Sequence, residues 1–420
     1  MTVTRWKQVR LKNLCVDAGQ YGLNISAENY AESGTRLLRT TDISSGALTP
    51  KEAGVFVSDP PEERFTLEKG DLLLSRSGTP PGQSYLVRAL DEGATFAGYL
   101  VRFRPQQGVD PRFLAYIAQS TPFQEKIRAE SVASTIQNFN AERYANIEFR
   151  APGPTEQRRI ADFLDAETVR LDALAAAMNS QDVSLKQRRL RVLDFASEHA
   201  PGTPLVRLGY LSSLVTSGSR GWGDFVSDTG SLFFRSANLH PDRVQPKLTN
   251  LVYVQVPAAA SSEAQRSRIE PGDVLIGITG ANAGWVCMAN DEVTGGHVSQ
   301  HVCLVRPDKH RIIGDWLALL IASPATQSKL MGNQYGGTKT QLSLPDIREI
   351  RIPVLSVEQQ VQMTHSIKRQ IDSIDRQRLL RQRQLALLTE RRQALITAAV
   401  TGQFDVSTAS GRNVTDGVSA

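Results

Sequence analysis

The sequence predicts a protein of mixed α/β class, of the α+β type, built from two similar globular domains and two long coiled-coil helices. Three observations lead to this prediction. With 420 residues, the chain is too long for one ordinary hydrophobic core. Several motifs recur in the same order about 200 residues apart, and each copy is followed by a long polar stretch with apolar residues at helical spacing.

The internal repeat is clearest around two aspartates. "EKGDLLLSRSGTPPG" (68–82) aligns without a gap to "EPGDVLIGITGANAG" (270–284), so that Asp71 and Asp273 are 202 residues apart (273 − 71). Further segments match at the same spacing within a residue: "GYLVRFRP" (98–105) with "QHVCLVRP" (300–307), and "FLAYIAQSTPFQEKI" (113–127) with "WLALLIASPATQSKL" (316–330). We therefore expect residues 1–153 and 200–354 to form two domains of one fold.

Within each globular half, short apolar runs bounded by glycine and proline predict strands. These runs are "DLLLSRS", "YLVRFRP", "DVLIGIT" and "HVCLVRP". "PRFLAYIAQSTPFQEKIRA" and "GDWLALLIASPATQSKLM" have apolar residues at helical spacing, but a proline interrupts each of them. Each is therefore expected to be one helix or two short ones.

The two long polar stretches, 154–199 and 355–402, predict long helices. Apolar residues alternate four and three apart, the pattern of a coiled-coil seam. The expected seam of the first helix is Ile160, Leu164, Leu171, Leu174, Met178, Leu185, Val192 and Phe195, and that of the second is Ile367, Ile371, Ile374, Leu385, Leu388, Leu395 and Ala399. The two helices are expected to pack on each other. A helix of about 45 residues is about 65 Å long and would be a rigid spacer. Residues 403–420 are rich in Ser, Gly, Thr and Asn, which predicts a disordered tail.

Composition excludes several classes of protein. No apolar stretch approaches the ~20 residues of a membrane span, and the first residues lack the apolar core of a signal peptide. Three cysteines form no disulfide framework, so a cytoplasmic location is expected. The net charge of +5 permits a polyanionic partner without identifying one. Two globular domains on a rigid spacer would fit an elongated nucleic-acid duplex. They would equally fit a scaffold that binds proteins through both domains.

The glycine-rich segments do not predict a nucleotide site. A Walker loop needs a lysine that reaches the phosphates, and neither 68–82 nor 270–284 has one at that position. In "GNQYGGTK" (332–339), Thr338 stands where that lysine is required. We interpret both segments as a strand followed by a tight turn in which glycine supplies positive φ.

Catalytic and metal motifs are equally incomplete. "DPPE" (59–62) has Glu62 where an adenine methyltransferase needs an aromatic residue, and "PDIREIR" (345–351) has arginine where a nuclease core needs lysine. His297, His301 and Cys303 suggest a metal site, but the corresponding first-half residues are no ligand set and no fourth ligand is evident. The sequence therefore predicts a chain that is not an enzyme and holds no metal.

The chain resembles the specificity subunits of type I restriction–modification systems, and the resemblance covers residues 5 to 406. Its sharpest part is "LLTERRQALITAAVTGQFDV" (387–406), together with "RIPVLSVEQQ" (351–360) at the start of the same helix. The first half repeats both as "LKQRRLRVLDFA" (185–196) and "APGPTEQRRIADFLD" (151–165). Further marks are the "LLRTTDI" and "LFFRSANL" segments.

The resemblance implies an arrangement and a set of partners. It implies that the globular domains are two target-recognition domains that read the halves of a bipartite site in double-stranded DNA. It implies that the helices are conserved spacer regions packed antiparallel, giving an internal pseudo-twofold repeat. The implied partners are two copies of a methyltransferase subunit and motor-nuclease restriction subunits. Association with a membrane is not expected. No cofactor is expected in this chain, and S-adenosylmethionine is expected in the methyltransferase.

Residues that contact DNA are expected in the loops that end the strands, where Arg, Lys, Asn, Gln, Ser and Thr meet phosphates and base edges. The candidates in the first domain are Arg39, Thr40, Thr41, Arg76, Ser77, Thr79, Gln137 and Asn138. Those in the second domain are Arg235, Ser236, Asn238, Thr279, Asn282, Gln334, Thr338 and Lys339.

Comparison of the two halves divides these candidates. Arg39 and Arg235 occupy matching positions, which favours a shared role, either a phosphate contact or an internal salt bridge. Arg76 and Ile278 differ between the halves, as do Pro80 and Asn282, so these positions are candidates for base specificity. Unlike loops predict an asymmetric site with two unlike half-sites. The alternatives are a two-headed adaptor of a methylation-linked system without a nuclease, and a protein-interaction scaffold that does not bind DNA.

Overall fold

The protein divides into two compact units. The computed structural model describes residues 6–44, 47–58, 61–77, 81–132, 138–198, 203–256, 258–332 and 341–406. Unit 1 is formed by Met1–Met178 with Arg383–Ala420, and unit 2 by Asn179–Gln382. Among the described residues, no helix is both long enough and apolar enough to cross a membrane.

Unit 1 is centred on a four-stranded antiparallel sheet of order β2-β10-β7-β8. Its strands are β2 (Gln20–Tyr21), β7 (Leu72–Ser75), β8 (Ser84–Leu86) and β10 (Leu100–Phe103). Every residue of β7 and β10 is buried, as a sheet covered on both faces requires. The runs "DLLLSRS" and "YLVRFRP" are thus confirmed as strands.

Smaller sheets complete unit 1. They have the orders β6-β3-β9, β1-β11 and β4-β5, and β3 pairs with β9 in parallel. The strands are β1 (Lys7–Arg10), β3 (Thr35–Leu38), β4 (Ile43–Ser44), β5 (Ala47–Leu48), β6 (Val55–Val57), β9 (Thr95–Phe96) and β11 (Glu148–Ala151). β1 lies against β11, the strand that comes directly before the first long helix.

Three short helices belong to unit 1: α1 (Pro111–Gln119), α2 (Thr121–Val132) and α3 (Ala141–Ala145). α1 begins after Asp110, whose carboxylate accepts a hydrogen bond from the Arg112 amide, with proline at the first helical position. Ser120 takes an extended conformation between α1 and α2. The proline in this segment therefore marks two helices, the second of the expected alternatives.

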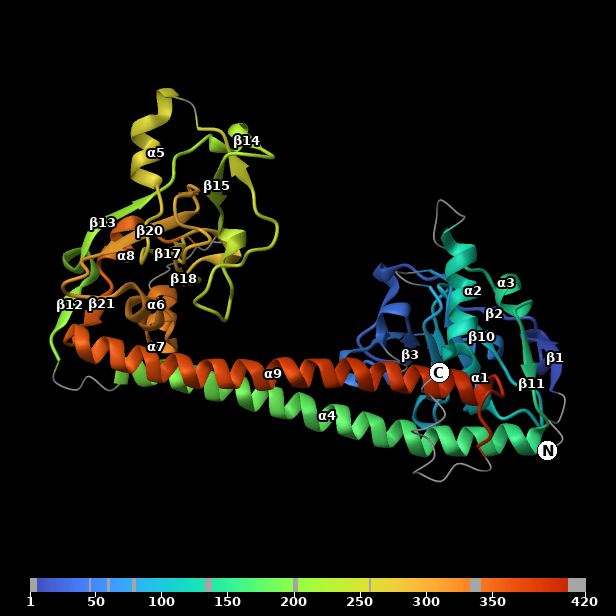
Figure 1. The fold of residues 1–420 in the computed structure, drawn as a ribbon. Helices are drawn as coiled ribbons and strands as arrows, with labels where there is room; N and C mark the ends of the chain where they lie inside the picture. The colour runs from blue at the N-terminus through green and yellow to red at the C-terminus, as the bar shows by residue number, and fades with distance from the viewer. Residues whose placement is uncertain are drawn as a thin grey trace. The chain divides into compact units, whose positions relative to one another are not determined.

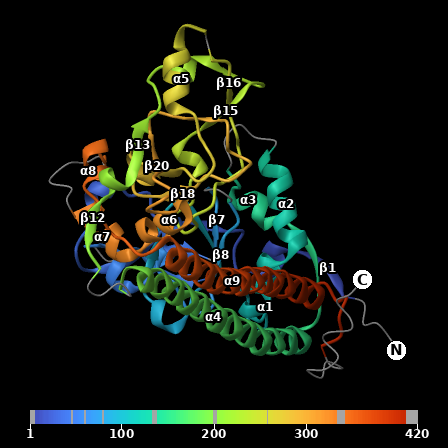
Figure 2. The same cartoon turned by 60° about the vertical axis from the view of Figure 1, so that its left-hand side comes forward.

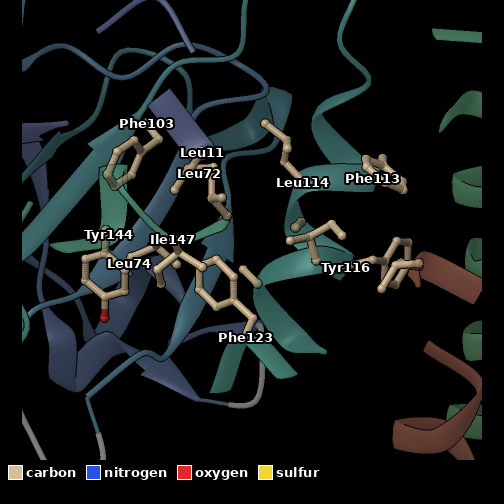
Figure 3. Packing of buried hydrophobic residues seen from close by; sticks show 14 of the residues in the cluster. Leu11, Leu72, Leu74, Phe103, Phe113, Leu114, Tyr116, Phe123, Tyr144 and Ile147 are labelled. Carbon is tan, nitrogen blue, oxygen red and sulfur yellow. The ribbon is translucent and has the colours of Figure 1, made fainter. Parts of the chain in front are cut away.

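The main core of unit 1 joins the sheet, the short helices and both long helices. Figure 3 shows aromatic and aliphatic side chains from β7, β10, α1, α2 and α3 packed together, with Tyr144 and Phe103 in edge contact. Residues near the end of the second long helix belong to the same core: Leu395, Ile396, Ala399 and Val400. Unit 1 is therefore built from both ends of the chain.

Unit 2 repeats this plan. Its central sheet has the order β13-β20-β17-β18, and its smaller sheets have the orders β14-β16-β15-β19 and β12-β21. The strands are β12 (Leu205–Arg207), β13 (Ser212–Ser217), β14 (Val226–Ser227), β15 (Ser231–Phe234), β16 (Tyr253–Val254), β17 (Val274–Gly277), β18 (Val286–Met288), β19 (His297–Val298), β20 (Val302–Pro307) and β21 (Arg351–Pro353). The helices are α5 (Ser261–Ser267), α6 (Gly314–Ala322), α7 (Pro324–Gly332) and α8 (Leu344–Arg348). Here too the interrupted segment forms two helices.

Buried glutamines show that the repeat extends to individual hydrogen bonds. Gln157 accepts a hydrogen bond from the Asp110 amide and donates to the Pro152 carbonyl. Gln360, 203 residues later (360 − 157), accepts from the Ile313 amide and donates to the Leu355 carbonyl. The pair ties the start of each long helix to its own globular domain and confirms that the two halves share one fold.

The long helices are α4 (Pro154–Glu198) and α9 (Val357–Val400), and each contributes one part to unit 1 and the other to unit 2. Within each unit the two helices lie side by side and antiparallel (Figure 1 and Figure 2). In unit 2, Asp182 of α4 pairs with Arg378 of α9, and Arg189 of α4 pairs with Asp375 of α9. One partner number rises as the other falls, which is the register of antiparallel helices.

The expected heptad seam is wrong at two positions of α4. Leu174 is 44% exposed and Phe195 is 43% exposed, whereas Leu185, Arg189 and Leu193 are buried. Between 168 and 192, the side chains that are not exposed lie at 168, 171, 175, 178, 182, 185, 189 and 192, so the stripe keeps the alternation of three and four residues. One position of each heptad lies a residue later than expected, with Ala175 in place of Leu174 and Arg189 in place of Arg188.

Candidate nucleic-acid interface

In unit 1, Arg76 lies where the buried strand β7 has just ended. Its Nε donates to Asn138 Oδ1 at 3.3 Å, and its Nη1 donates to the Gly98 carbonyl at 3.5 Å. The guanidinium carbon lies 4.9 Å from the centre of the Tyr21 ring, a cation–π contact. Three contacts from three different segments therefore hold one partly buried cation in a fixed orientation.

The surrounding backbone explains why these residues meet. Ser77 forms an isolated β-bridge with Asn138, and the Arg76 amide donates to the Tyr99 carbonyl. Tyr99 itself is 63% exposed. We call Tyr21, Arg76, Ser77, Tyr99 and Asn138 cluster 1.

Unit 2 places a corresponding set of residues at the same backbone positions. Thr279 forms an isolated β-bridge with Gln341, as Ser77 does with Asn138. The Ile278 amide donates to the His301 carbonyl, as Arg76 does to Tyr99. Sheet register completes the correspondence, because Val101 pairs with Tyr21 and Cys303 with Ser217. We call Ser217, Ile278, Thr279, His301 and Gln341 cluster 2.

Cluster 2 has different chemistry from cluster 1. Ile278 replaces the arginine and is only 7% exposed, so this position offers no polar group. The exposed His301 is held on both ring nitrogens, with Thr279 Oγ1 at 2.8 Å from Nδ1 and Gln300 Nε2 at 3.1 Å from Nε2. Both ring nitrogens of His301 therefore have a hydrogen-bond partner, which fixes the orientation of the imidazole beside the Thr279 hydroxyl.

Two matching arginines outside the clusters serve the fold. Arg39 donates from Nε and Nη2 to the buried Asp42 carboxylate at 3.1 and 2.8 Å, and hydrogen bonding to Asp42 raises the pKa of this guanidinium. Arg235 donates from Nη2 to the Asn250 carbonyl at 2.9 Å. Of the two shared roles expected for this position, Arg39 forms the internal salt bridge.

The structure gives Asn238 a different role from the predicted contact with DNA. It is 1% exposed, its Oδ1 accepts from the Arg235 amide, and its Nδ2 donates to the Lys247 carbonyl. It closes a one-turn helix as Asp42 does in unit 1. Because the Asn238 side chain is buried and its amide is used within its own turn, it stabilises that turn and is not accessible to a base edge.

The other predicted residues divide into described and undescribed ones. Thr40 is half-buried and Thr41 is exposed in the turn after β3, and Ser236 is half-buried in the matching turn. Asn282 Nδ2 donates to the Ser236 carbonyl at 3.0 Å, so these two loops of unit 2 are joined. The remaining candidates lie outside the described residues: Thr79, Gln137, Gln334, Thr338 and Lys339.

Sequence reasoning did not select Tyr21, Tyr99, Ser217, His301 or Gln341 for this region. Tyr21 and Ser217 are the last residues of β2 and β13, the edge strands of the two central sheets. Tyr99 and His301 come one residue before β10 and β20, the strands that pair with those edge strands. The only signal in the sequence is position: Tyr99 and His301 are 202 residues apart, the same offset as Asp71 and Asp273.

The residues considered for a metal site have other surroundings. His297 Nδ1 lies 3.3 Å from Ser267 Oγ, and its ring meets that of Trp222 in edge contact. Cys303 is buried in the core of unit 2, and burial raises the pKa of its thiol to about 12. Within the part of the chain that the structure describes, no three His, Cys, Asp or Glu residues come together as a possible metal site.

Comparison with known proteins connects this geometry to a family. Residues 5–176 match the family described as Type I restriction modification DNA specificity domain. The specificity subunit of the type I restriction enzyme StySPI from Salmonella potsdam is 22% identical over 213 residues, which are 50% of this chain and 44% of that protein. The match thus spans less than half the length of that curated relative.

Two solved structures share the fold over nearly the whole chain. One, from work on complex assembly and conformational transition of the type I R-M system, has a TM-score of 0.76 at 17% identity and covers 96% of this chain and 99% of its own. The other, the HsdS subunit from Thermoanaerobacter tengcongensis, has a TM-score of 0.53 at 19% identity and covers 96% and 98%. Residues 5–176 thus match the type I restriction–modification specificity domain, and the whole chain, with its repeated units and paired long helices, shares the fold of these two solved structures.

Proposed function

We propose that this chain is the DNA-recognition subunit of a type I restriction–modification complex, and that units 1 and 2 each read one half of an asymmetric bipartite site. The observation that carries the proposal is the correspondence of clusters 1 and 2. They occupy the same backbone positions in two copies of one fold, yet one presents an oriented cation and the other an oriented threonine–histidine pair. Different donors and acceptors select different base edges, so the two half-sites are unlike.

Within this proposal the chain recognises DNA and does no chemistry. The match of residues 5–176 to the specificity domain, and the likeness to a curated specificity subunit, support a non-catalytic recognition role. Methylation of adenine and cleavage belong to partner subunits, and S-adenosylmethionine binds to the methyltransferase. The cytoplasmic location expected from the sequence stays a prediction.

The internal repeat supports two copies of one methyltransferase partner. The hydrogen bonds of Gln157 recur at Gln360, so each long helix begins in the same way beside its own domain. A chain with two equivalent surfaces can bind the same partner twice, as a symmetric dimer would. We propose that the long helices hold these partners and set the number of unread base pairs between the half-sites.

Sequencing of methylated genomic DNA tests the proposal. Cells express the chain with its cognate methyltransferase, and matched cells lack only the chain. We expect methyladenine in one two-part asymmetric motif in the first cells and none at that motif in the second. Methylation that persists without the chain would contradict a recognition role.

Domain exchange tests the assignment of half-sites. Residues 1–150 are replaced by the corresponding segment of a relative with a different methylation motif. We expect one half of the motif to change while the other half stays the same. A change in both halves would contradict independent reading by the two units.

A further inference from the structure

Building on the proposed function, we propose that Arg76 reads a guanine in the half-site of unit 1, and that Tyr21 and Asn138 are its positioning residues. Arg76 is one of the few partly buried arginines in the described residues of unit 1 whose contacts include no carboxylate. Arg39, Arg104 and Arg112 each pair with an aspartate. The full positive charge of Arg76 is therefore available to a ligand.

Comparison with unit 2 indicates a base contact and argues against a phosphate contact. Phosphates have the same structure along both half-sites, so a phosphate-binding arginine is useful in both units. Cluster 2 has the buried Ile278 at the position of Arg76 and Ser217 at the position of Tyr21. Unit 1 thus has both the arginine and the tyrosine ring that supports it, and unit 2 has neither. This is expected if the two residues together recognise one particular base.

The donors left on Arg76 match guanine. A guanidinium has five N–H groups, and contacts with described residues use Nε and one N–H of Nη1. This leaves a donor on each terminal nitrogen, side by side in one plane. Guanine presents two acceptors, O6 and N7, at the matching spacing in the major groove, and no other base edge offers such a pair there.

Tyr21 and Asn138 fix the plane of this fork before DNA arrives. Tyr21 lies under the guanidinium, and its own hydroxyl accepts a hydrogen bond from the Ala141 amide at 2.9 Å. Asn138 is anchored in turn by its bridge to Ser77. A side chain that is already ordered loses little conformational entropy on binding, so the contact discriminates more sharply.

Three substitutions test the assignment in cells that express the chain with its cognate methyltransferase. Arg76→Lys keeps the charge but removes the planar fork, Arg76→Met removes both, and Tyr21→Leu removes the ring beneath the guanidinium. Arg88→Met is the matched control, because Arg88 is an exposed arginine of the same unit outside cluster 1. The measurement is the fraction methylated at every genomic variant of the motif that differs by one base pair.

We expect both Arg76 variants to lose preference at one G·C pair in one half of the motif, by about tenfold or more, with the other half unchanged. Tyr21→Leu should weaken preference at the same pair. The unchanged half-site shows that each variant still folds and assembles. Arg88→Met should leave the motif as it is.

Two results would overturn the inference. If Arg76→Lys behaves as the parent chain and Arg76→Met lowers methylation equally at all motif variants, Arg76 contacts a phosphate. If preference is lost at an A·T pair, Arg76 reads another base. Failure of the proposed function is distinguishable from both, because the unsubstituted chain would then direct no methylation at all.

Discussion

Arg306 donates two parallel hydrogen bonds to the buried carboxylate of Asp273, from Nε to Oδ1 at 3.0 Å and from Nη2 to Oδ2 at 2.9 Å. Asp273 is 1% exposed and also accepts a hydrogen bond from the Glu270 amide in the turn before β17. Arg104 and Asp71 repeat the pair in unit 1 at 2.8 Å for both bonds. Asp71 and Asp273, whose spacing first indicated the repeat, therefore join the turn before β7 or β17 to the end of the neighbouring strand β10 or β20.

Asp273→Asn should destabilise unit 2 by about 3 kcal/mol, because it removes the buried one of the two carboxylates that pair with Arg306 and leaves this partly buried arginine only the exposed one. Glu270→Gln is the control: Glu270 also pairs with Arg306 but is 54% exposed, so its loss should cost about 0–1 kcal/mol. Urea denaturation of the full chain, with hydrogen exchange to locate the change, measures both. Equal losses in the two variants would show that burial of the pair does not matter.

Gly218→Ala should destabilise unit 2 by about 1–3 kcal/mol or more. A Cβ at Gly218 would lie 1.8 Å from the Val298 carbonyl oxygen, because two backbone segments meet there. Gly223→Ala in the same unit is the control, since its Cβ would meet nothing within 4 Å. Thermal unfolding of the two variants checks the prediction, and an unchanged Gly218→Ala protein would contradict the close approach.

Unit 2 should lose stability as the pH falls below neutrality. Burial is the largest cause that lowers the pKa of His297 below its usual value of 6.5, and nearby Arg268 lowers it further. The unfolded chain therefore takes up a proton on His297 before the folded chain does, so stability is complete above about pH 6.5 and declines below it. Thermal unfolding from pH 7.5 to 5 measures this slope. His297→Gln should flatten it, and an unaltered slope would assign the effect to other groups.

Arg378→Met should destabilise unit 2 by about 3 kcal/mol. Arg378 donates to Asp182 of α4 at 3.0 Å and to Asp242 of the globular domain at 3.2 Å, and its side chain is only 10% exposed. The substitution leaves both carboxylates without their shared cation. Arg376→Met removes an exposed arginine of the same helix and should cost little. Chemical denaturation compares the two, and similar values for both would contradict a specific role for Arg378.

Much of the fold could be predicted because it rests on local signals that occur twice. The apolar strands, the prolines that separate α1 from α2 and α6 from α7, and the polar helices all recur at one offset. The seam of α4 was harder to predict. Whether Leu174 or Thr168 is buried depends on which neighbouring surface covers the helix, and that is a property of packing.

The candidate site was predicted only in part. Arg76 and Thr279 follow strands and carry suitable donors, so their sequence context was enough. Tyr21 and His301 were missed because their importance comes from pairing between distant segments, such as Val101 with Tyr21. Asn238 was selected for its residue type, although its hydrogen-bonding capacity is used within its own turn.

The core of unit 1 includes Leu395 and Val400, which are translated long after the first segment of that unit, Met1–Met178. During synthesis, the first globular domain leaves the ribosome before the helix that completes its core exists, and all of unit 2 is made in the meantime. A premature stop codon just after residue 382 would therefore spare every residue of unit 2 and damage the domain that was made first.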